Sequence, residues 1–229
     1  MKPVRLGPIL VLFARPARAG EVKTRLGAAV GGARAFELYL AFLRDSIELL
    51  HRVSPRGVRA GIAWAGRVEP RGEIDEALEG IEVLQQEGED LGQRMSNCIA
   101  DLLARGHDRV AIIGADTPSL PLETLHRAFD ALRDHDLVLG PSADGGYYLM
   151  GGRAVVPEIF RDIPWGTGRV LGETLRVLKI LGIPPVLLRE WFDVDTLEDL
   201  EKLRESLSSL PKGDPTARHT RAALERASP

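Results

Sequence analysis

Short runs of apolar residues alternate along this chain with longer segments in which apolar residues recur at helical spacing. The run at residues 9–13 is continuous, which is typical of a parallel strand covered on both faces. Residues 34–51 place Phe36, Leu43 and Ile47 on one face of an amphipathic helix. The alternation predicts an α/β fold with a mostly parallel sheet between two layers of helices. We expect further strands at 58–64, 81–84, 110–113, 137–140, 147–150 and 186–188, and helices at 90–105, 122–134, 168–181 and 197–207.

The length of 229 residues suits one domain with its own core, which we expect to span residues 1–210. Residues 211–229 form a polar tail with few apolar side chains. We expect this tail to be loosely attached or disordered unless it packs on a partner. The oligomeric state leaves no signal in the sequence.

The composition disfavours several classes of protein. The chain has 30 basic and 33 acidic side chains and a net charge of −3, whereas nucleic-acid binding draws on an excess of Lys and Arg. No apolar stretch reaches the ~20 residues that a membrane span needs. The single cysteine, Cys98, excludes an internal disulfide framework and favours a reducing compartment. We therefore expect a cytoplasmic protein in which Cys98 is a buried small hydrophobe.

Two common kinds of active site are also disfavoured. The five histidines are scattered and form no His-x-x-x-His pair, which argues against a zinc site. The serines lack a Gly-x-Ser-x-Gly elbow, which argues against an α/β-hydrolase.

The first candidate segment is a basic loop that follows the first expected strand and carries Arg15, Lys23 and Arg25. Gly20 lets its backbone turn closely. Such a loop at a strand end can hold a polyphosphate, because backbone N–H groups and basic side chains meet the negative charge. Its spacing is neither that of a Walker loop nor that of a dinucleotide fingerprint, and a solvated basic loop is the alternative.

The second candidate is Asp116, which stands just past the strand expected at 110–113. Gly114 before it and Pro118 after it force an abrupt exit from that strand. A carboxylate at this place can hold Mg²⁺ or Mn²⁺ against substrate phosphates. The alternative is that Asp116 only caps the next helix.

Two further segments carry carboxylates. Asp144 precedes Gly145 and Gly146, which allow a ligand to approach the backbone closely, although Asp-Gly is also an ordinary turn signal. Near the C-terminus, the spacing of Asp195 and Glu198 predicts a capping box. Asp193 is not needed for that cap and is free to be a second metal ligand.

These segments, taken in order, resemble a known family. They are Phe-Ala-Arg-Pro and Gly-Glu-Val-Lys-Thr-Arg-Leu within 13–26, Gln86 with Asp-Leu-Gly-Gln-Arg-Met at 90–95, Ile-Gly-Ala-Asp-Thr-Pro at 113–118, Asp-Gly-Gly-Tyr-Tyr at 144–148, Trp165, and Asp-Val-Asp-Thr at 193–196. The chain is similar, over about residues 8–207, to the bacterial family of glycosyltransferase-A-like proteins assigned as nucleotide-diphospho-sugar transferases or as a domain of unknown function. The resemblance implies a three-layer, Rossmann-like nucleotide-diphospho-sugar transferase fold.

The resemblance also implies roles for individual residues. Arg15, Lys23 and Arg25 would contact nucleotide phosphates, and Asp116 would be the metal or nucleotide carboxylate. Asp193 matches the C-terminal metal aspartate of related nucleotidylyltransferases, including the 2-phospholactate guanylyltransferases and the cytidylyltransferases of isoprenoid synthesis. We expect nucleotide binding by Arg15, Gly20, Lys23, Arg25, Gln86, Gly114, Asp116, Gly145 and Gly146, catalysis by Lys23, Arg25, Asp116 and Asp144, and Mg²⁺ or Mn²⁺ at Asp116 and Asp193.

One departure from the pattern matters. Many glycosyltransferases of this fold have Asp-x-Asp after the central strand, whereas this chain has Asp116-Thr-Pro118. A second metal carboxylate would therefore have to come from Asp193 or Asp144.

Three hypotheses for function follow. The first is a metal-dependent glycosyltransferase that takes a nucleotide-activated sugar and a small-molecule acceptor. The second is a nucleotidylyltransferase that joins a nucleoside triphosphate to a phosphorylated acceptor and releases pyrophosphate. The third is a non-catalytic nucleotide-binding protein, because fold does not fix function.

Overall fold

The computed structural model describes residues 5–67 and 73–226. The chain begins with β1 (Gly7–Ala14), α1 (Thr24–Val30), α2 (Gly32–Val53), η1 (Ser54–Arg56), β2 (Arg59–Trp64), α3 (Glu73–Ala77), β3 (Glu82–Gln85) and α4 (Leu91–Ala104). It continues with β4 (His107–Gly114), α5 (Leu122–Asp134), β5 (Leu137–Pro141), β6 (Tyr147–Gly152), η2 (Pro157–Phe160), α6 (Val170–Leu181), β7 (Val186–Leu187), α7 (Leu197–Ser208) and α8 (Arg218–Glu225).

The strands form one sheet in the order β3-β2-β1-β4-β6-β5-β7. The pairs on the β3 side of β4 are parallel, whereas β6 runs antiparallel to both β4 and β5. The prediction of a mostly parallel sheet is thereby confirmed. β1 lies inside the sheet between β2 and β4, and its carboxyl end lies beside the carboxyl ends of these two strands.

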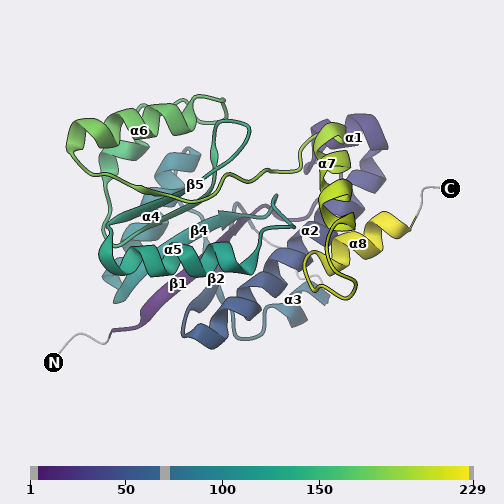
Figure 1. Ribbon diagram of the computed structural model, residues 1–229, viewed down its shortest axis with the longest axis horizontal. Helices are drawn as coiled ribbons and strands as arrows, with labels where there is room; N and C mark the ends of the chain where they lie inside the picture. The colour runs from purple at the N-terminus through teal and green to yellow at the C-terminus, as the bar shows by residue number, and fades with distance from the viewer. Residues whose placement is uncertain (1–4, 68–72, 227–229) are drawn as a thin grey trace.

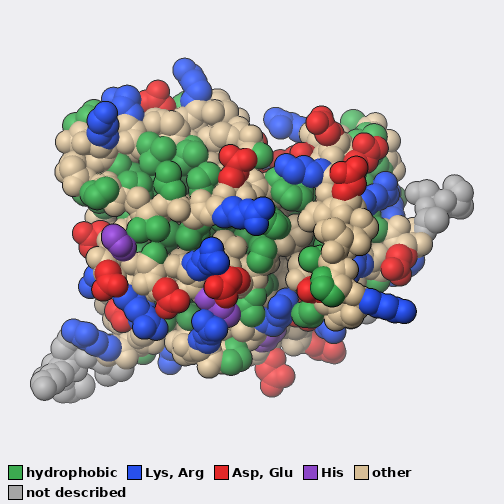
Figure 2. Space-filling view, in the orientation of Figure 1, with side chains coloured by type: hydrophobic (Ala, Val, Ile, Leu, Met, Phe, Trp, Pro, Cys, Tyr) green, Lys and Arg blue, Asp and Glu red, His purple; other side chains and the backbone are tan. Residues whose placement is uncertain are grey.

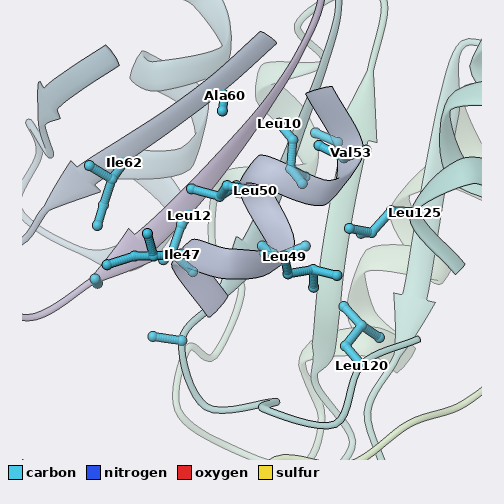
Figure 3. Packing of buried hydrophobic residues seen from close by; sticks show 14 of the residues in the cluster. Leu10, Leu12, Ile47, Leu49, Leu50, Val53, Ala60, Ile62, Leu120 and Leu125 are labelled. Carbon is cyan, nitrogen blue, oxygen red and sulfur yellow. The ribbon is translucent and has the colours of Figure 1, made fainter. Parts of the chain in front are cut away.

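Alternate residues of β1 pack into two different hydrophobic cores. Leu10 and Leu12 pack with α2, α3 and α5 on one face of the sheet, while Ile9 and Val11 pack with α4 and α6 on the other. Figure 3 shows Leu10 and Leu12 close to the α2 side chains Ile47, Leu50 and Val53. This period of two places helices on both faces, as a continuous apolar strand requires.

A third cluster lies at the end of the molecule where α1, α7 and α8 gather (Figure 1). Its fully buried residues include Leu26 of α1, Leu38 and Phe42 of α2, and Leu203 of α7. The cluster joins the first helix of the chain to the last ones. It therefore supports the loop that precedes α1 and the segment that precedes α7.

The expectation of a loose C-terminal tail is wrong for residues 218–225, which form α8. Its first turn docks on Asp45 of α2, which is 6% exposed. The Asp45 carboxylate accepts hydrogen bonds from the backbone N–H groups of His219 (2.9 Å) and Thr220 (2.8 Å) and from the Thr220 hydroxyl (2.6 Å). A buried polar anchor of this kind replaces the apolar content that the tail lacks.

The surface carries charges of both signs, and the length and apolar character of the helices bear on whether the chain could cross a membrane. On the face in Figure 2, basic and acidic side chains are interspersed over the described residues. Among the helices of the described residues, none combines the length and the apolar character that crossing a membrane would require.

Candidate active site

The carboxyl ends of β1 and β4 open onto a cleft of about 620 Å³. Open α/β sheets bind ligands at this edge. The cleft brings together most of the predicted basic loop and the predicted Asp116. It is lined by Phe13, Ala14, Arg15, Glu21, Val22, Lys23, Thr24, Arg25, Tyr39, Ala65, Gln86, Glu89, Asp90, Leu91, Arg94, Gly114, Ala115, Asp116 and Asp195.

Some predicted residues lie outside this lining. Gly20 is exposed in the basic loop, where its φ of 82° is the left-handed conformation that glycine favours. Asp144, Gly145, Gly146 and Asp193 belong to neighbouring loops rather than to the cleft wall.

Tyr39 of α2 fixes the point where the basic loop leaves β1. Its hydroxyl donates a hydrogen bond to the Arg15 carbonyl oxygen (2.7 Å) and accepts one from the Arg15 N–H (3.1 Å). Burial, and then the negative charge of Asp116, raise the pKa of Tyr39, so the hydroxyl keeps the proton that it donates. The sequence analysis missed this residue, because on its own it fits the apolar face of a helix.

Gln86 forms part of the cleft floor. Its side-chain amide donates to the carbonyl oxygens of Ala63 (2.8 Å) and Ala14 (3.4 Å), at the ends of β2 and β1. The amide nitrogen is therefore used to join strand ends, whereas the prediction gave Gln86 a role in nucleotide binding.

Lys23 connects the basic loop to two carboxylates. Its Nζ lies 2.5 Å from Oδ1 of Asp116 and 2.7 Å from Oδ1 of Asp195. Burial alone would lower the pKa of the Lys23 ammonium, but the two carboxylates outweigh it and the pKa is raised. Lys23 therefore stays charged, and it holds the start of the chain against a residue near its end.

The structure corrects the role of Asp195. The N-cap of α7 is Thr196, which forms a capping box with Asp199. The expected box of Asp195 and Glu198 is therefore displaced by one residue, and Asp195 is left to pair with Lys23. Two overlapping capping patterns occur in this segment, and the local sequence does not decide between them.

Asp193 is half-buried and lies outside the lining of the cleft. Its Oδ2 accepts a hydrogen bond from the Ser142 hydroxyl (2.9 Å), which comes from the loop between β5 and β6. Burial raises the pKa of Asp193 to about 7, the Ser142 bond opposes this, and the charges of Asp116 and Asp144 add to it. The next residue, Val194, donates its N–H to the Asp116 carbonyl oxygen (2.9 Å), so this segment lies beside the end of β4.

Asp144 opens an exposed turn after β5. Its Oδ1 accepts the N–H of Gly146 (2.9 Å), which is the turn interaction that Asp-Gly predicts. Gly145 has a φ of 86°, and a Cβ there would overlap the carbonyl oxygen of Gly168. Gly145 is therefore needed where this turn meets the loop before α6.

Arg94 of α4 is a cleft residue that the sequence analysis did not single out. Its Nε donates to the Gly88 carbonyl oxygen (3.0 Å), which directs the guanidinium. Together with Arg15 and Arg18 it also lines an adjoining pocket of about 210 Å³. Arg94 could have been found from the motif at residues 90–95, because it is the arginine of that motif and lies on the first turns of an amphipathic helix.

The carboxylates near the cleft fit a magnesium ion of the kind that takes most of its ligands from phosphates and water. The negative charge of Asp116 is among the causes that raise the pKa of Asp193, so the two side chains lie near each other. In the described residues, a group of three donors within 4.8 Å of one another occurs elsewhere, at Asp45, Glu48 and His219. That group is accounted for by the docking of α8, because Arg218 already pairs with Glu48 at 2.6 Å.

Comparison with known proteins agrees with the fold. Residues 49–167 match the model of a family described as uncharacterized proteins conserved in bacteria (DUF2064). No curated protein matches the sequence. A solved structure from Desulfovibrio desulfuricans G20, provisionally assigned as a nucleotide-diphospho-sugar transferase, is 29% identical with a TM-score of 0.84, covering 97% of this chain and 95% of that one.

More distant structures share the fold at lower identity. One is CMP:2-keto-3-deoxy-manno-octonic acid synthetase complexed with CTP, at 15% identity and a TM-score of 0.53, covering 88% of this chain and 98% of that one. Another is a nucleotidyl transferase from Methanothermobacter thermautotroptrophicus, at 17% identity and a TM-score of 0.55, with the same two coverages of 88% and 98%. The predicted nucleotide-diphospho-sugar transferase fold is confirmed.

Proposed function

We propose a transferase function on a nucleotide-activated substrate for this chain, which belongs to the DUF2064 family of uncharacterized proteins conserved in bacteria. The observation that carries the proposal is the cleft at the ends of β1 and β4, where arginines and carboxylates face one space. The neighbouring structures, which are transferases and nucleotidyltransferases, support the same class.

The first proposed reaction is transfer of a sugar from its nucleotide diphosphate to a small-molecule acceptor. The exposed Arg15 and Arg25 lie along the cleft and would meet the growing negative charge on the leaving diphosphate. Among the described residues, neither guanidinium is held in an ion pair, so both are available to a ligand. Guanidinium groups suit this task because they bind phosphate oxygens in pairs.

Asp116 and Asp193 are the residues that would hold Mg²⁺ or Mn²⁺. Such an ion, when bound, stabilises the charge of a leaving diphosphate as a Lewis acid. Asp144, on its exposed turn, is proposed to orient the acceptor hydroxyl or to take its proton.

The second proposed reaction is nucleotidyl transfer from a nucleoside triphosphate, and one observation favours it. Arg15, Arg18 and Arg94 together line the pocket beside the cleft. A triphosphate carries more negative charge than a diphosphate sugar and needs more cations along its path. A third possibility is nucleotide binding without turnover.

The test is a ligand screen by thermal denaturation of the purified protein. Nucleoside diphosphates, triphosphates and sugar nucleotides are compared with and without Mg²⁺ or Mn²⁺, for wild type, Asp116→Ala and Arg25→Ala, with the exposed Lys212→Ala as control. A ligand at about 100 times its Kd stabilises the fold by ~2.7 kcal/mol.

The outcomes separate the proposals. A shift with a sugar nucleotide that needs metal and is lost in Asp116→Ala supports glycosyl transfer. A preference for a triphosphate, with pyrophosphate released on addition of an acceptor, supports nucleotidyl transfer. Nucleotide binding without any turnover supports the non-catalytic nucleotide-binding protein. If no nucleotide shifts the denaturation temperature, all three proposals are contradicted.

A further inference from the structure

Lys23 differs from the other cations of the cleft in where its charge lies. Its side chain is 3% exposed, whereas the side chains of Asp116 and Asp195 are 44% and 47% exposed. Lys23 belongs to the lining of the cleft, but its ammonium is covered, and the two carboxylates are the more exposed members of the trio. A phosphate in the cleft would meet those carboxylates first.

The chemistry of the three groups allows Lys23 to act as a brace, meaning a side chain that holds Asp116 and Asp195 in fixed positions. An ammonium has three N–H donors, and two of them are directed at one oxygen of each carboxylate. Both contacts use Oδ1, so the Oδ2 atom of each carboxylate is not engaged by Lys23. One positive and two negative charges leave the trio with a net charge of −1.

The backbone also fixes Lys23 in this role. Its φ of 50° and ψ of 42° place a non-glycine residue in the left-handed region directly before α1. Such a conformation is unfavourable for a residue with a side chain and persists only where the surroundings enforce it. The two ion pairs, which reach residues 116 and 195 from position 23, supply that enforcement.

We infer that Lys23 is a positioning residue, which aligns Asp116 and Asp195 as a pair of acceptors on the cleft wall and does not bind substrate phosphate itself. Asp195 thereby becomes a functional carboxylate of the cleft. The phosphate charge is met by Arg15, Arg25 and Arg94. This inference rests on the proposal that the cleft binds nucleotide phosphates.

The test uses inorganic pyrophosphate as the probe and a set of charge-balanced variants. Binding is measured by titration calorimetry in EDTA for wild type, Lys23→Met, Asp195→Asn and the double variant. The double variant retains only Asp116 and so has the same net charge of −1 as the wild-type trio. Arg25→Met serves as the control for loss of a phosphate contact, and the exposed Lys212→Met as the control for loss of a distant charge.

The inference predicts a reversal in the double variant. Lys23→Met alone weakens pyrophosphate binding about tenfold, because two uncompensated carboxylates then face the anion. Adding Asp195→Asn brings the affinity back to within about threefold of wild type. Arg25→Met stays weak, and Lys212→Met does not change the affinity.

A direct phosphate contact by Lys23 would give a different result. Both Lys23 variants would then lack the ammonium that contacts the phosphate. The double variant would bind pyrophosphate about tenfold or more weakly than wild type, and this result would overturn the inference.

A second measurement separates this outcome from failure of the proposed function. If wild type binds neither pyrophosphate nor any nucleotide, in EDTA or with Mg²⁺ or Mn²⁺ added, the proposed function fails. The unfolding free energies of the same four proteins still decide whether Lys23 braces Asp195. A brace makes the two substitutions non-additive, and additive effects contradict it.

Discussion

Asp193→Asn should make the protein more stable at neutral and alkaline pH. The wild-type carboxyl is buried against the Ser142 hydroxyl, and burial raises its pKa from the usual value near 3.8 to about 7. Above this pH the folded protein holds a charge that the unfolded chain would expose to water. An asparagine can still accept the Ser142 hydrogen bond but carries no charge.

The size of the effect follows from the shift. About three pKa units at ~1.4 kcal/mol per unit correspond to about 4 kcal/mol as the upper limit of the cost of the charge. Between pH 4 and 7 the folded state binds a proton that the unfolded state has released, so the stability of wild type falls as pH rises through this window. From pH 5 to pH 8, wild type should therefore lose about 2–3 kcal/mol relative to the asparagine variant.

Guanidinium denaturation in EDTA at pH 5 and pH 8 measures this difference. The exposed Glu198→Gln removes a nearby carboxylate without the burial and serves as the matched control. Equal pH dependence of wild type and Asp193→Asn would refute the reasoning, because it would mean that Asp193 is not desolvated in the folded protein.

Three other perturbations have definite expected outcomes. Gly145→Ala should lower the unfolding free energy by about 2 kcal/mol or more, since its φ of 86° and its contact with the loop before α6 both exclude a side chain; Gly146→Ala, measured by the same denaturation, should cost clearly less. Burial raises the pKa of the Cys98 thiol to about 12, so iodoacetamide at pH 8 should label it about a hundredfold more slowly in the folded protein than in denaturant, and equal rates would contradict its burial. Asp45→Ala removes the anchor of α8 and should cost about 1–3 kcal/mol, with faster amide hydrogen exchange in residues 218–225; unchanged exchange there would show that α8 docks by other contacts.

The central strands of the sheet were predictable because β1 and most of β4 are continuous apolar runs. Leu10 and Ile9 have to be buried on opposite faces, and that requirement alone places helices on both sides. α1 and α8 were missed for the same physical reason. Both are short, and both are held by the third cluster, in which α1 packs with the distant α7 and α8 packs with the distant α2.

The candidate site was predictable in position but not in every partner. Asp116 follows from the abrupt end of β4, and the basic loop follows from the end of β1. The pairing of Asp195 with Lys23 could not be found locally. Thr196 and Asp195 are both good N-caps, and the choice is settled by Lys23, whose ion pair spans 172 positions of the chain. Whether these residues bind a nucleotide or a metal stays a prediction.

The pairing of residue 23 with residue 195 also delays completion of the cleft during synthesis. Asp195 lies 172 positions after Lys23, a separation that takes roughly 10–30 seconds to translate at about 5–20 residues per second. Until Asp195 has left the ribosome, the arginine-rich loop lacks the acidic partner that lines its cleft. A chain released before residue 193 therefore carries the cations of the cleft but neither Asp193 nor Asp195.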